Sequence, residues 1–274
     1  MSTLLLPVHE QISMALMSYH ETGKWSKDYA KIGLTPGDGG GLSVGWGQAA
    51  LQTDDRVLGG MLEQYMDDAT ALHSSALRPY MPGLLSLDQA TQADSGLHEL
   101  LRTMAADPLW RSIQDRKFAS YLDRARNRWK ARGWSSHMSL CLLLDMEIQH
   151  GSDWLVDRAL RAIDGKGHQS YRDLLIMGTK DHYGGVWDGY GVEPYDPDVE
   201  ADVVWATLLC RLDFLMTEAR NSDEQVTWRG STYRCNHLMW LYENHTEDFA
   251  WGMQVQTTHP DNKLWTISPE LLIG

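Results

Sequence analysis

One segment constrains the fold of this chain more than any other, because residues 138–148 are apolar on nearly every face of a helix. The segment reads MSLCLLLDMEI and continues as QHG. A helix of this kind has no face suited to water, so it is buried in the middle of a domain. We therefore expect this helix at the centre of the fold.

The central helix also carries polar, titratable side chains, among them Asp145 and His150. Burial of a charged group is costly unless the group is paired and hydrogen-bonded. We therefore expect a partner for the Asp145 carboxylate from another part of the chain.

Helical periodicity dominates the remaining sequence. An apolar stripe from Val8 to Tyr19 predicts a first helix that ends near Gly23. The clearest helix runs from about Pro108 to Arg132, because Asp107 is a good N-cap, proline fits the first turn and Gly133 stops it. Further helical patterns cover residues 54–73, 88–106, 154–163, 171–177 and 199–220.

Two other segments are not helical in pattern. Residues 33–47 are rich in glycine, and the alternation of Leu42, Val44 and Trp46 predicts a turn with a short strand or hairpin. Residues 184–202 are rich in Gly, Pro, Asp and aromatic residues, which indicates a long loop. The tail beyond residue 220 has a mixed pattern. We therefore expect a mainly α-helical (α+β) fold with a small β-sheet and no interdomain linker.

Composition narrows the possible partners. The chain has 274 residues and a formal net charge of -13, which disfavours nucleic acid and suits a cationic partner. It contains no apolar run near the roughly 18–20 residues of a membrane helix. The start, MSTLLLPVHEQ, lacks the basic n-region of a secretory signal. We therefore expect neither a nucleic-acid nor a membrane partner.

Cysteine and histidine usage gives no sign of a metal centre. The sequence contains neither HExxH nor CxxC, and its eleven histidines are scattered, so we expect no metal or cofactor. Cys141 and Cys210 lie in apolar helical patterns and are expected to be buried free thiols.

Two carboxylates carry the chemistry that this sequence suggests. Glu21 lies at the end of the first helix, where the helix dipole disfavours the ionised form and raises the carboxyl pKa. Asp38 lies between glycines that leave its carboxylate in water and ionised. A protonated and an ionised carboxyl together are what glycosidic bond hydrolysis requires. Taken singly, the two residues also suit a surface glutamate and an ordinary Asp-Gly turn.

The combination of Glu21, the turn GDGGGLSVG and the helix end DMEIQHG resembles the family 46 chitosanases of the lysozyme-like superfamily. The resemblance implies an inverting endo-glycosidase that acts on chitosan. Glu21 would be its general acid and Asp38 its general base, and the Ser43 hydroxyl would help to hold the attacking water. It also implies one catalytic domain over residues 1–274, with a substrate cleft between two lobes and a minor lobe over about 24–105.

The resemblance further implies a buried charge network and a substrate contact. Asp145, His150 and Gly151 match the end of the family's central helix, and Arg211 matches an arginine that pairs with the central aspartate and leads to the catalytic acid. A second arginine completes this network, for which Arg229 is slightly favoured over Arg234. Asp55, with Asp54 beside it, falls where the family binds the amino sugar.

Departures from the family pattern leave other functions open. Gly40 and Leu42 stand where the family usually has an arginine and an aromatic residue. One alternative is a lysozyme-like muramidase acting on peptidoglycan, and another is a non-catalytic glycan-binding protein. A third is an anion-binding protein that uses the basic face of residues 111–132, although such a face is more often solvated or paired. The family resemblance implies an extracellular protein, and we expect a monomer.

Overall fold

The computed structural model describes residues 7–34, 40–52, 56–163, 196–221, 225–244, 249–256 and 264–272. The predicted helix over 171–177 and most of the predicted loop over 184–202 lie outside these residues. The chain divides into two compact units. Unit 1 comprises residues 1–13 and 124–268, and unit 2 comprises residues 14–123 and 269–274.

Two helices contribute to both units. The boundary falls between Ser13 and Met14 inside helix α1, and between Asp123 and Arg124 inside helix α7. Helix α1 spans Val8–Thr22 and α7 spans Pro108–Ala131, so both predicted helices are present within a residue or two of their expected ends. Gly23 and Gly133 follow them with φ of 75° and 69°, the left-handed backbone that glycine adopts at helix ends.

Unit 1 is built around the predicted central helix, α8. This helix spans His137–His150 and is buried continuously from Met138 to Glu147. Ser136 caps its start by accepting a hydrogen bond from the backbone N–H of Ser139, and Gly151 ends it with φ of 67°. The expected buried central helix is therefore present, and local capping residues set both of its ends.

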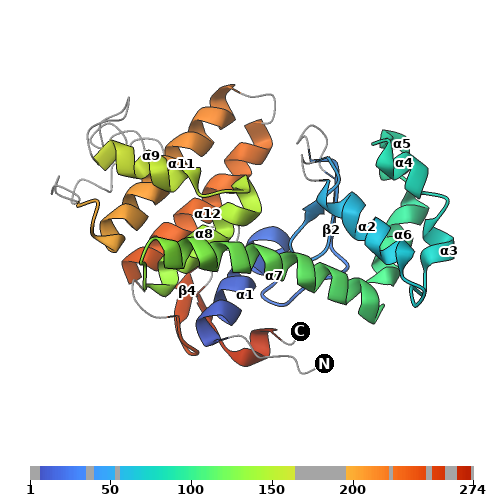
Figure 1. Cartoon of the computed structure of the whole chain (residues 1–274), viewed down its shortest axis with the longest axis horizontal. Helices are drawn as coiled ribbons and strands as arrows, with labels where there is room; N and C mark the ends of the chain where they lie inside the picture. Colours follow the sequence, from blue (N-terminus) through green and yellow to red (C-terminus); the bar gives the residue numbers. More distant parts are fainter. Residues whose placement is uncertain are drawn as a thin grey trace. The chain divides into compact units, whose positions relative to one another are not determined.

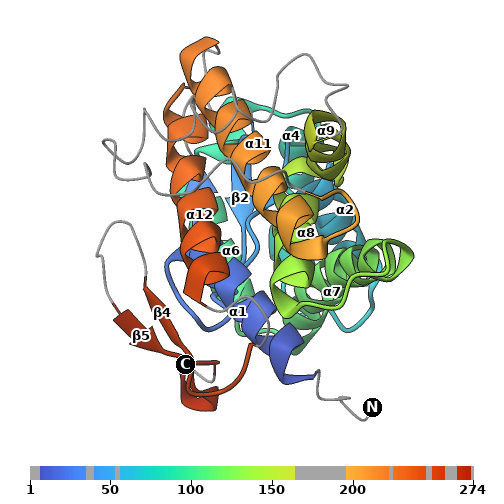
Figure 2. The same ribbon diagram turned by 90° about the vertical axis from the view of Figure 1, so that its left-hand side faces the viewer.

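Three further helices of the described residues lie wholly in unit 1. They are α9 (Trp154–Ile163), α11 (Glu200–Asn221) and α12 (Gln225–Asn244). Helices α11 and α12 run side by side in both views, and both contact α8 (Figure 1). Figure 2 shows the antiparallel pair of strands β4 (Gln254–Gln256) and β5 (Leu264–Thr266) beyond them in the same unit.

Helix α12 lies in the tail, where the sequence pattern is mixed. Its inner face buries polar residues, among them Arg234 and His237, beside apolar residues such as Cys235 and Leu238. Charged and polar residues on the buried face interrupt the apolar stripe by which an amphipathic helix is recognised. The buried polar residues of α12, Arg234 among them, therefore explain why the sequence pattern did not predict this helix.

Unit 2 contains a small sheet followed by a series of helices. Strands β1 (Ile32–Leu34), β2 (Leu42–Val44) and β3 (Ala49–Ala50) pair antiparallel in the order β1-β2-β3, with Gly33 opposite Ser43. The helices are α2 (Val57–Asp67), α3 (Ser74–Leu77), α4 (Met81–Leu85), α5 (Gln89–Gln92) and α6 (Ser95–Met104), and a 3-10 turn, η1 (Pro269–Leu272), belongs to the same unit.

The predicted helices over 54–73 and 88–106 are each shorter or divided in the structure. Helix α2 ends at Asp67 because the Asp68 side chain accepts hydrogen bonds from the Thr70 N–H and hydroxyl in an alternative turn. The second region is two helices, because Asp88 caps α5 and Asp94 caps α6. Side-chain hydrogen bonds to the backbone thus override a continuous apolar pattern.

The C-terminal half of α7 places its arginines against acidic residues of unit 1. Arg124 Nε donates to Glu147 Oε2 at 2.8 Å, and Arg128 contacts the other oxygen of this fully buried carboxylate. Arg126 pairs with Glu10, and Arg132 pairs with Asp153 and Asp157. These arginines of the basic face are therefore paired with acidic neighbours, as the more common interpretation of such a face expects.

The fold class is confirmed: the chain is mainly helical, with a small antiparallel sheet and a buried central helix. Cys141 and Cys210 are buried free thiols as expected, and so is Cys235. Across the described part of the chain, no helix has both the length and the apolar character needed to cross a membrane.

Candidate active site

The last turn of α1 presents Glu21, the predicted general acid. The helix ends at Thr22, and the N–H of Gly23, the next residue, donates to the Tyr19 carbonyl at 2.8 Å. Glu21 is partly buried. Tyr19 and Trp25, close to Glu21 in sequence, are buried and form a stacked pair with ring centroids 4.6 Å apart.

Tyr29, in the segment that follows α1, contacts α7. Its hydroxyl contacts both oxygens of Asp115, at 2.9 and 3.0 Å, and the Arg111 guanidinium lies 5.1 Å from the centre of its ring. Burial and the Asp115 carboxylate raise the pKa of Tyr29 far above its usual range. Tyr29 therefore remains a neutral hydrogen-bond donor that ties the segment after α1 to α7.

Strand β2 presents Ser43, the residue expected to hold the attacking water. The strand is anchored by Leu42 and Val44, both fully buried, so that Ser43 between them points to the opposite face. Residues 35–39, which include Asp38, lie outside the described residues, as do Asp54 and Asp55. The assignments of these three carboxylates stay predictions.

Two glycines let the turn after β2 pack directly on α7. A Cβ atom on Gly45 would lie 1.9 Å from Gln114 Oε1, and one on Gly47 would lie 2.0 Å from the Phe118 ring. The ring of Trp46, between them, packs against Phe118 at 4.5 Å. Close approach of backbone to helix thus fixes the position of β2, and with it Ser43, within unit 2.

Asp145 receives counter-ions from two helices of unit 1. Its side chain is fully buried, Arg211 of α11 contacts Oδ2, and Arg234 of α12 donates to Oδ1 through Nε at 3.1 Å and Nη2 at 2.5 Å. Arg211 also donates to Gln149 Oε1, one turn further along α8. This arrangement supplies the partners that a buried carboxylate requires.

Of the two arginines proposed from the sequence as the second member of the network, the structure describes the side chain of Arg234 only, and the role of Arg229 stays a prediction. Arg234, ranked second, makes the contact with Asp145. The side chain of Arg229, the favoured residue, lies outside the described residues. The mixed pattern of the tail concealed that Arg234 lies on the buried face of a helix, so sequence spacing alone could not separate the two.

His150 ends α8 and is held in its neutral form. Burial lowers the pKa of His150 to about 3, and the nearby Arg211 guanidinium lowers it further than Asp145 raises it. The imidazole packs edge-on against Phe214, with ring centroids 5.7 Å apart. A neutral ring at this position avoids adding a third positive charge beside the two arginines.

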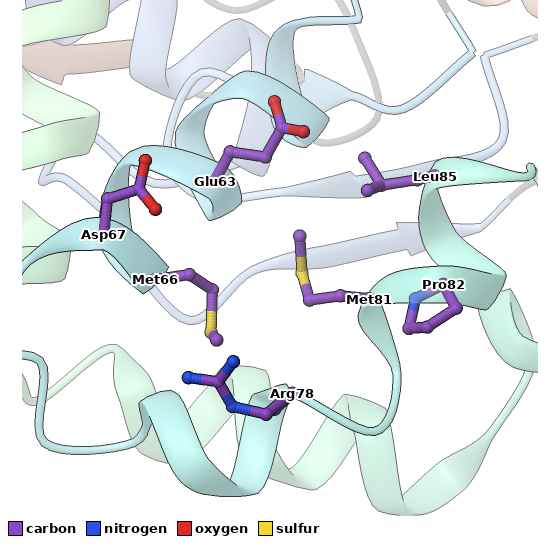
Figure 3. A pocket seen from close by; sticks show the side chains of 7 residues that line it. All are labelled: Glu63, Met66, Asp67, Arg78, Met81, Pro82 and Leu85. Carbon is purple, nitrogen blue, oxygen red and sulfur yellow. The ribbon is translucent and has the colours of Figure 1, made fainter.

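A groove of about 460 Å³ opens on unit 2, and none of the predicted site residues lines it (Figure 3). Glu63, Met66 and Asp67 of α2 line one side, and the segment that includes α4 lines the other with Arg78, Met81, Pro82 and Leu85. Within the described part of the chain, no group of three or more His, Cys, Asp or Glu side chains could hold a metal ion.

Unit 1 contains a buried central helix with a twice-paired aspartate, and unit 2 contains a glutamate at a helix end and a hydroxyl on a short sheet. Each of these features is one that the resemblance implies for a helical glycosidase. The profile of glycosyl hydrolase family 46 matches residues 15–183, which is more than half of the chain. The chain therefore belongs to glycosyl hydrolase family 46 and is a glycoside hydrolase. The matched segment includes Glu21, Asp38, Ser43 and Asp145.

Solved structures have the same fold. The native chitosanase of Bacillus subtilis MY002 is 23% identical, with a TM-score of 0.68 over 96% of this chain and 100% of that chain. A mutant of that chitosanase complexed with 6 GlcN is 22% identical, with a TM-score of 0.68 and the same coverage. The family 46 chitosanase of Gynuella sunshinyii, in complex with chitotetraose, is 20% identical, with a TM-score of 0.66 over 96% and 98%. The comparison with curated proteins found no match.

Proposed function

We propose that this glycoside hydrolase is an inverting endo-glycosidase that cleaves the β-1,4 linkages of chitosan. The observation that carries the proposal is the family match across the segment with Glu21, Asp38 and Ser43. The amino-sugar ligands of two similar structures, 6 GlcN and chitotetraose, support the choice of substrate. The acidic balance of the chain, with a net charge of -13, suits a polymer that carries ammonium groups.

In the proposed reaction Glu21 donates its proton to the glycosidic oxygen as the bond to the anomeric carbon breaks. Asp38 removes a proton from a water molecule, whose oxygen forms the new bond to the anomeric carbon from the opposite face. Ser43 holds that water. Inversion requires the two carboxyl groups to stand roughly 6.5–9.5 Å apart, which leaves room for the water between them.

Substrate recognition is assigned to Asp54 and Asp55. Each carboxylate provides acceptors for the ammonium group of a glucosamine unit, and a charge-assisted hydrogen bond is stronger than a neutral one. The cleft between two lobes and the connection from Asp145 through the arginines to Glu21 belong to the same proposal. So do an extracellular location and a monomeric state.

The test compares wild type with Glu21→Gln on chitosan, chitin and purified peptidoglycan, with reducing ends counted. Wild type should release reducing ends from chitosan, and the variant should lose about 10²- to 10⁴-fold in rate, the usual contribution of general acid catalysis. Glu99→Gln, at a position of α6 where the side chain is 76% exposed, is the matched control and should keep the wild-type rate.

Other results would point to other functions. Cleavage of peptidoglycan alone would identify a muramidase, and glycan binding without reducing ends would identify a binding protein. A Glu21→Gln variant with the wild-type rate on chitosan would show that the acid is another residue. An anion-binding function is disfavoured, because Arg124, Arg126, Arg128 and Arg132 are paired with acidic residues.

A further inference from the structure

Gln48, in the turn between β2 and β3, has a role that the proposed mechanism does not yet use. It adopts φ of 47°, a left-handed backbone that is uncommon for residues other than glycine. Its backbone N–H donates to the Gly45 carbonyl at 3.1 Å, which closes the turn. Its side chain folds back over the same turn and reaches Ser43.

The orientation of the Gln48 amide follows from its partners. One end lies 2.8 Å from the Gly45 carbonyl oxygen, which can only accept a hydrogen bond, so this end must be the NH₂ group. The other end is therefore Oε1, and it lies 2.8 Å from Ser43 Oγ. Because Oε1 can only accept, the Ser43 hydroxyl must be the donor.

The second neighbour of the Ser43 hydroxyl leads to the same assignment. The Gly33 carbonyl oxygen lies 3.3 Å from Ser43 Oγ, and it too is only an acceptor. A hydroxyl has a single proton, which is directed to the nearer oxygen of Gln48. Ser43 Oγ therefore offers only lone pairs to any further partner.

Gly33 makes room for this arrangement. It lies opposite Ser43 in the β1–β2 register. A Cβ atom at this position would lie 2.4 Å from Gln48 Oε1 and 2.5 Å from Ser43 Oγ, closer than such atoms approach. The contacting side-chain atoms of Gln48 and Ser43 therefore pack against the backbone of Gly33. Neither side chain has space to shift toward β1.

We infer that Gln48 is a positioning residue that fixes the Ser43 hydroxyl as an acceptor toward the attacking water. The inference rests on the proposed function. A water that donates one O–H to Ser43 and the other to the general base keeps a lone pair directed at the anomeric carbon. The base takes its proton as the new C–O bond forms, and the general acid protonates the departing oxygen, so all protons are accounted for.

The experiment is a double-mutant cycle with Gln48→Met and Ser43→Ala on chitosan. Methionine keeps the length of the side chain and removes both the acceptor for Ser43 and the Nε2 donor to the Gly45 carbonyl. The kcat of Gln48→Met should fall about five- to tenfold, the worth of one hydrogen bond, with KM unchanged. The double variant should have the kcat of Ser43→Ala alone, because Gln48 acts only through that hydroxyl. Gln64→Met, on the exposed face of α2, is the matched control and should retain wild-type kinetics.

Three outcomes would overturn the inference. The first is a Gln48→Met variant with the kcat of wild type. The second is a double variant whose loss in kcat is the product of the two single losses. The third is a rise in the KM of Gln48→Met as large as its fall in kcat. If Gln48→Met does not fold, Gln48→Gly replaces it, since glycine adopts the left-handed backbone without strain.

A cycle on thermal unfolding separates this inference from the proposed function. Ser43→Ala and Gln48→Met should lower the melting temperature by less together than the sum of their single effects. Inactivity of the wild type on chitosan would reject the proposed substrate while this coupling still supported the hydroxyl assignment. Additive shifts in melting temperature would reject the assignment itself.

Discussion

At the residue scale, the buried carboxylate of Asp145 organises unit 1. Its side chain and that of Arg211 are fully buried, and Arg234 is 4% exposed. Asp145 lies on α8, Arg211 on α11 and Arg234 on α12, so one carboxylate joins three helices. Removing Arg211 leaves Asp145 paired with Arg234 alone and takes a buried donor away from Asp145 Oδ2 and Gln149 Oε1, and breaking up such a buried network is costly.

Arg211→Ala should therefore lower the free energy of unfolding by about 3–5 kcal/mol. Denaturant unfolding followed by circular dichroism measures this loss. Arg102→Ala is the control, because Arg102 forms an exposed pair with Glu99 on α6 and should cost at most about 1 kcal/mol. Equal stabilities of the Arg211→Ala variant and wild type would contradict a structural role for the Asp145 pair.

At the element scale, the turn between β2 and β3 depends on a close approach to α7. Gly45 has φ of 85°, and its Cα lies against the Gln114 side chain of that helix. Gly60, inside α2, is exposed, and a Cβ atom added there would meet open space. Gly45 is therefore required by its backbone conformation and its close neighbour, whereas Gly60 has no such constraint and only weakens the helix.

Alanine at these positions should have opposite effects. Gly45→Ala should destabilise the protein by about 1–3 kcal/mol, from backbone strain and displacement of Gln114, and should lower kcat by shifting β2. Gly60→Ala should stabilise it by about 0.4–1 kcal/mol with no change in rate. Thermal unfolding and initial rates on chitosan measure both effects, and a neutral Gly45→Ala would show that the turn tolerates a different packing.

At the scale of the whole molecule, two histidine sites make unit 1 sensitive to acid. Burial and Arg211 hold His150 neutral, with its pKa lowered to about 3. The His9 ring stacks on His137 at 4.0 Å, and burial followed by the charge of His137 lowers the pKa of His9 as well. The His137 Nδ1 accepts the backbone N–H of Phe249 at 3.2 Å.

Stability should consequently decrease as the pH falls below the ordinary histidine pKa of about 6.5. Between that pH and about 3, the unfolded chain binds a proton at His150 that the folded chain does not. From pH 7 to pH 5 this one group should remove about 2 kcal/mol from the free energy of unfolding. The free energy of unfolding of His150→Gln, measured by urea unfolding at pH 7 and pH 5, should change less with pH than that of wild type. An identical slope in the variant and wild type would contradict a neutral His150.

Several elements follow from local sequence alone. The ends of α1, α7 and α8 coincide with residues that act through their own side chain or backbone, such as Ser136 and the glycines at 23, 133 and 151. The apolar run of residues 138–148 required burial whatever surrounded it, and burial required a partner for Asp145. These are properties of a short segment and its solvent, so no distant contact was needed to predict them.

The sequence by itself therefore determined the helical class, the central helix, and the family to which its motifs point. Only the tertiary structure decided that Arg234 pairs with Asp145, that α12 is a helix with a polar buried face, and that Gln48 directs the Ser43 proton. The reason is physical. Helix ends and burial depend on neighbours along the chain, whereas the partner of a charge or a hydroxyl depends on which side chains the fold brings within hydrogen-bond distance.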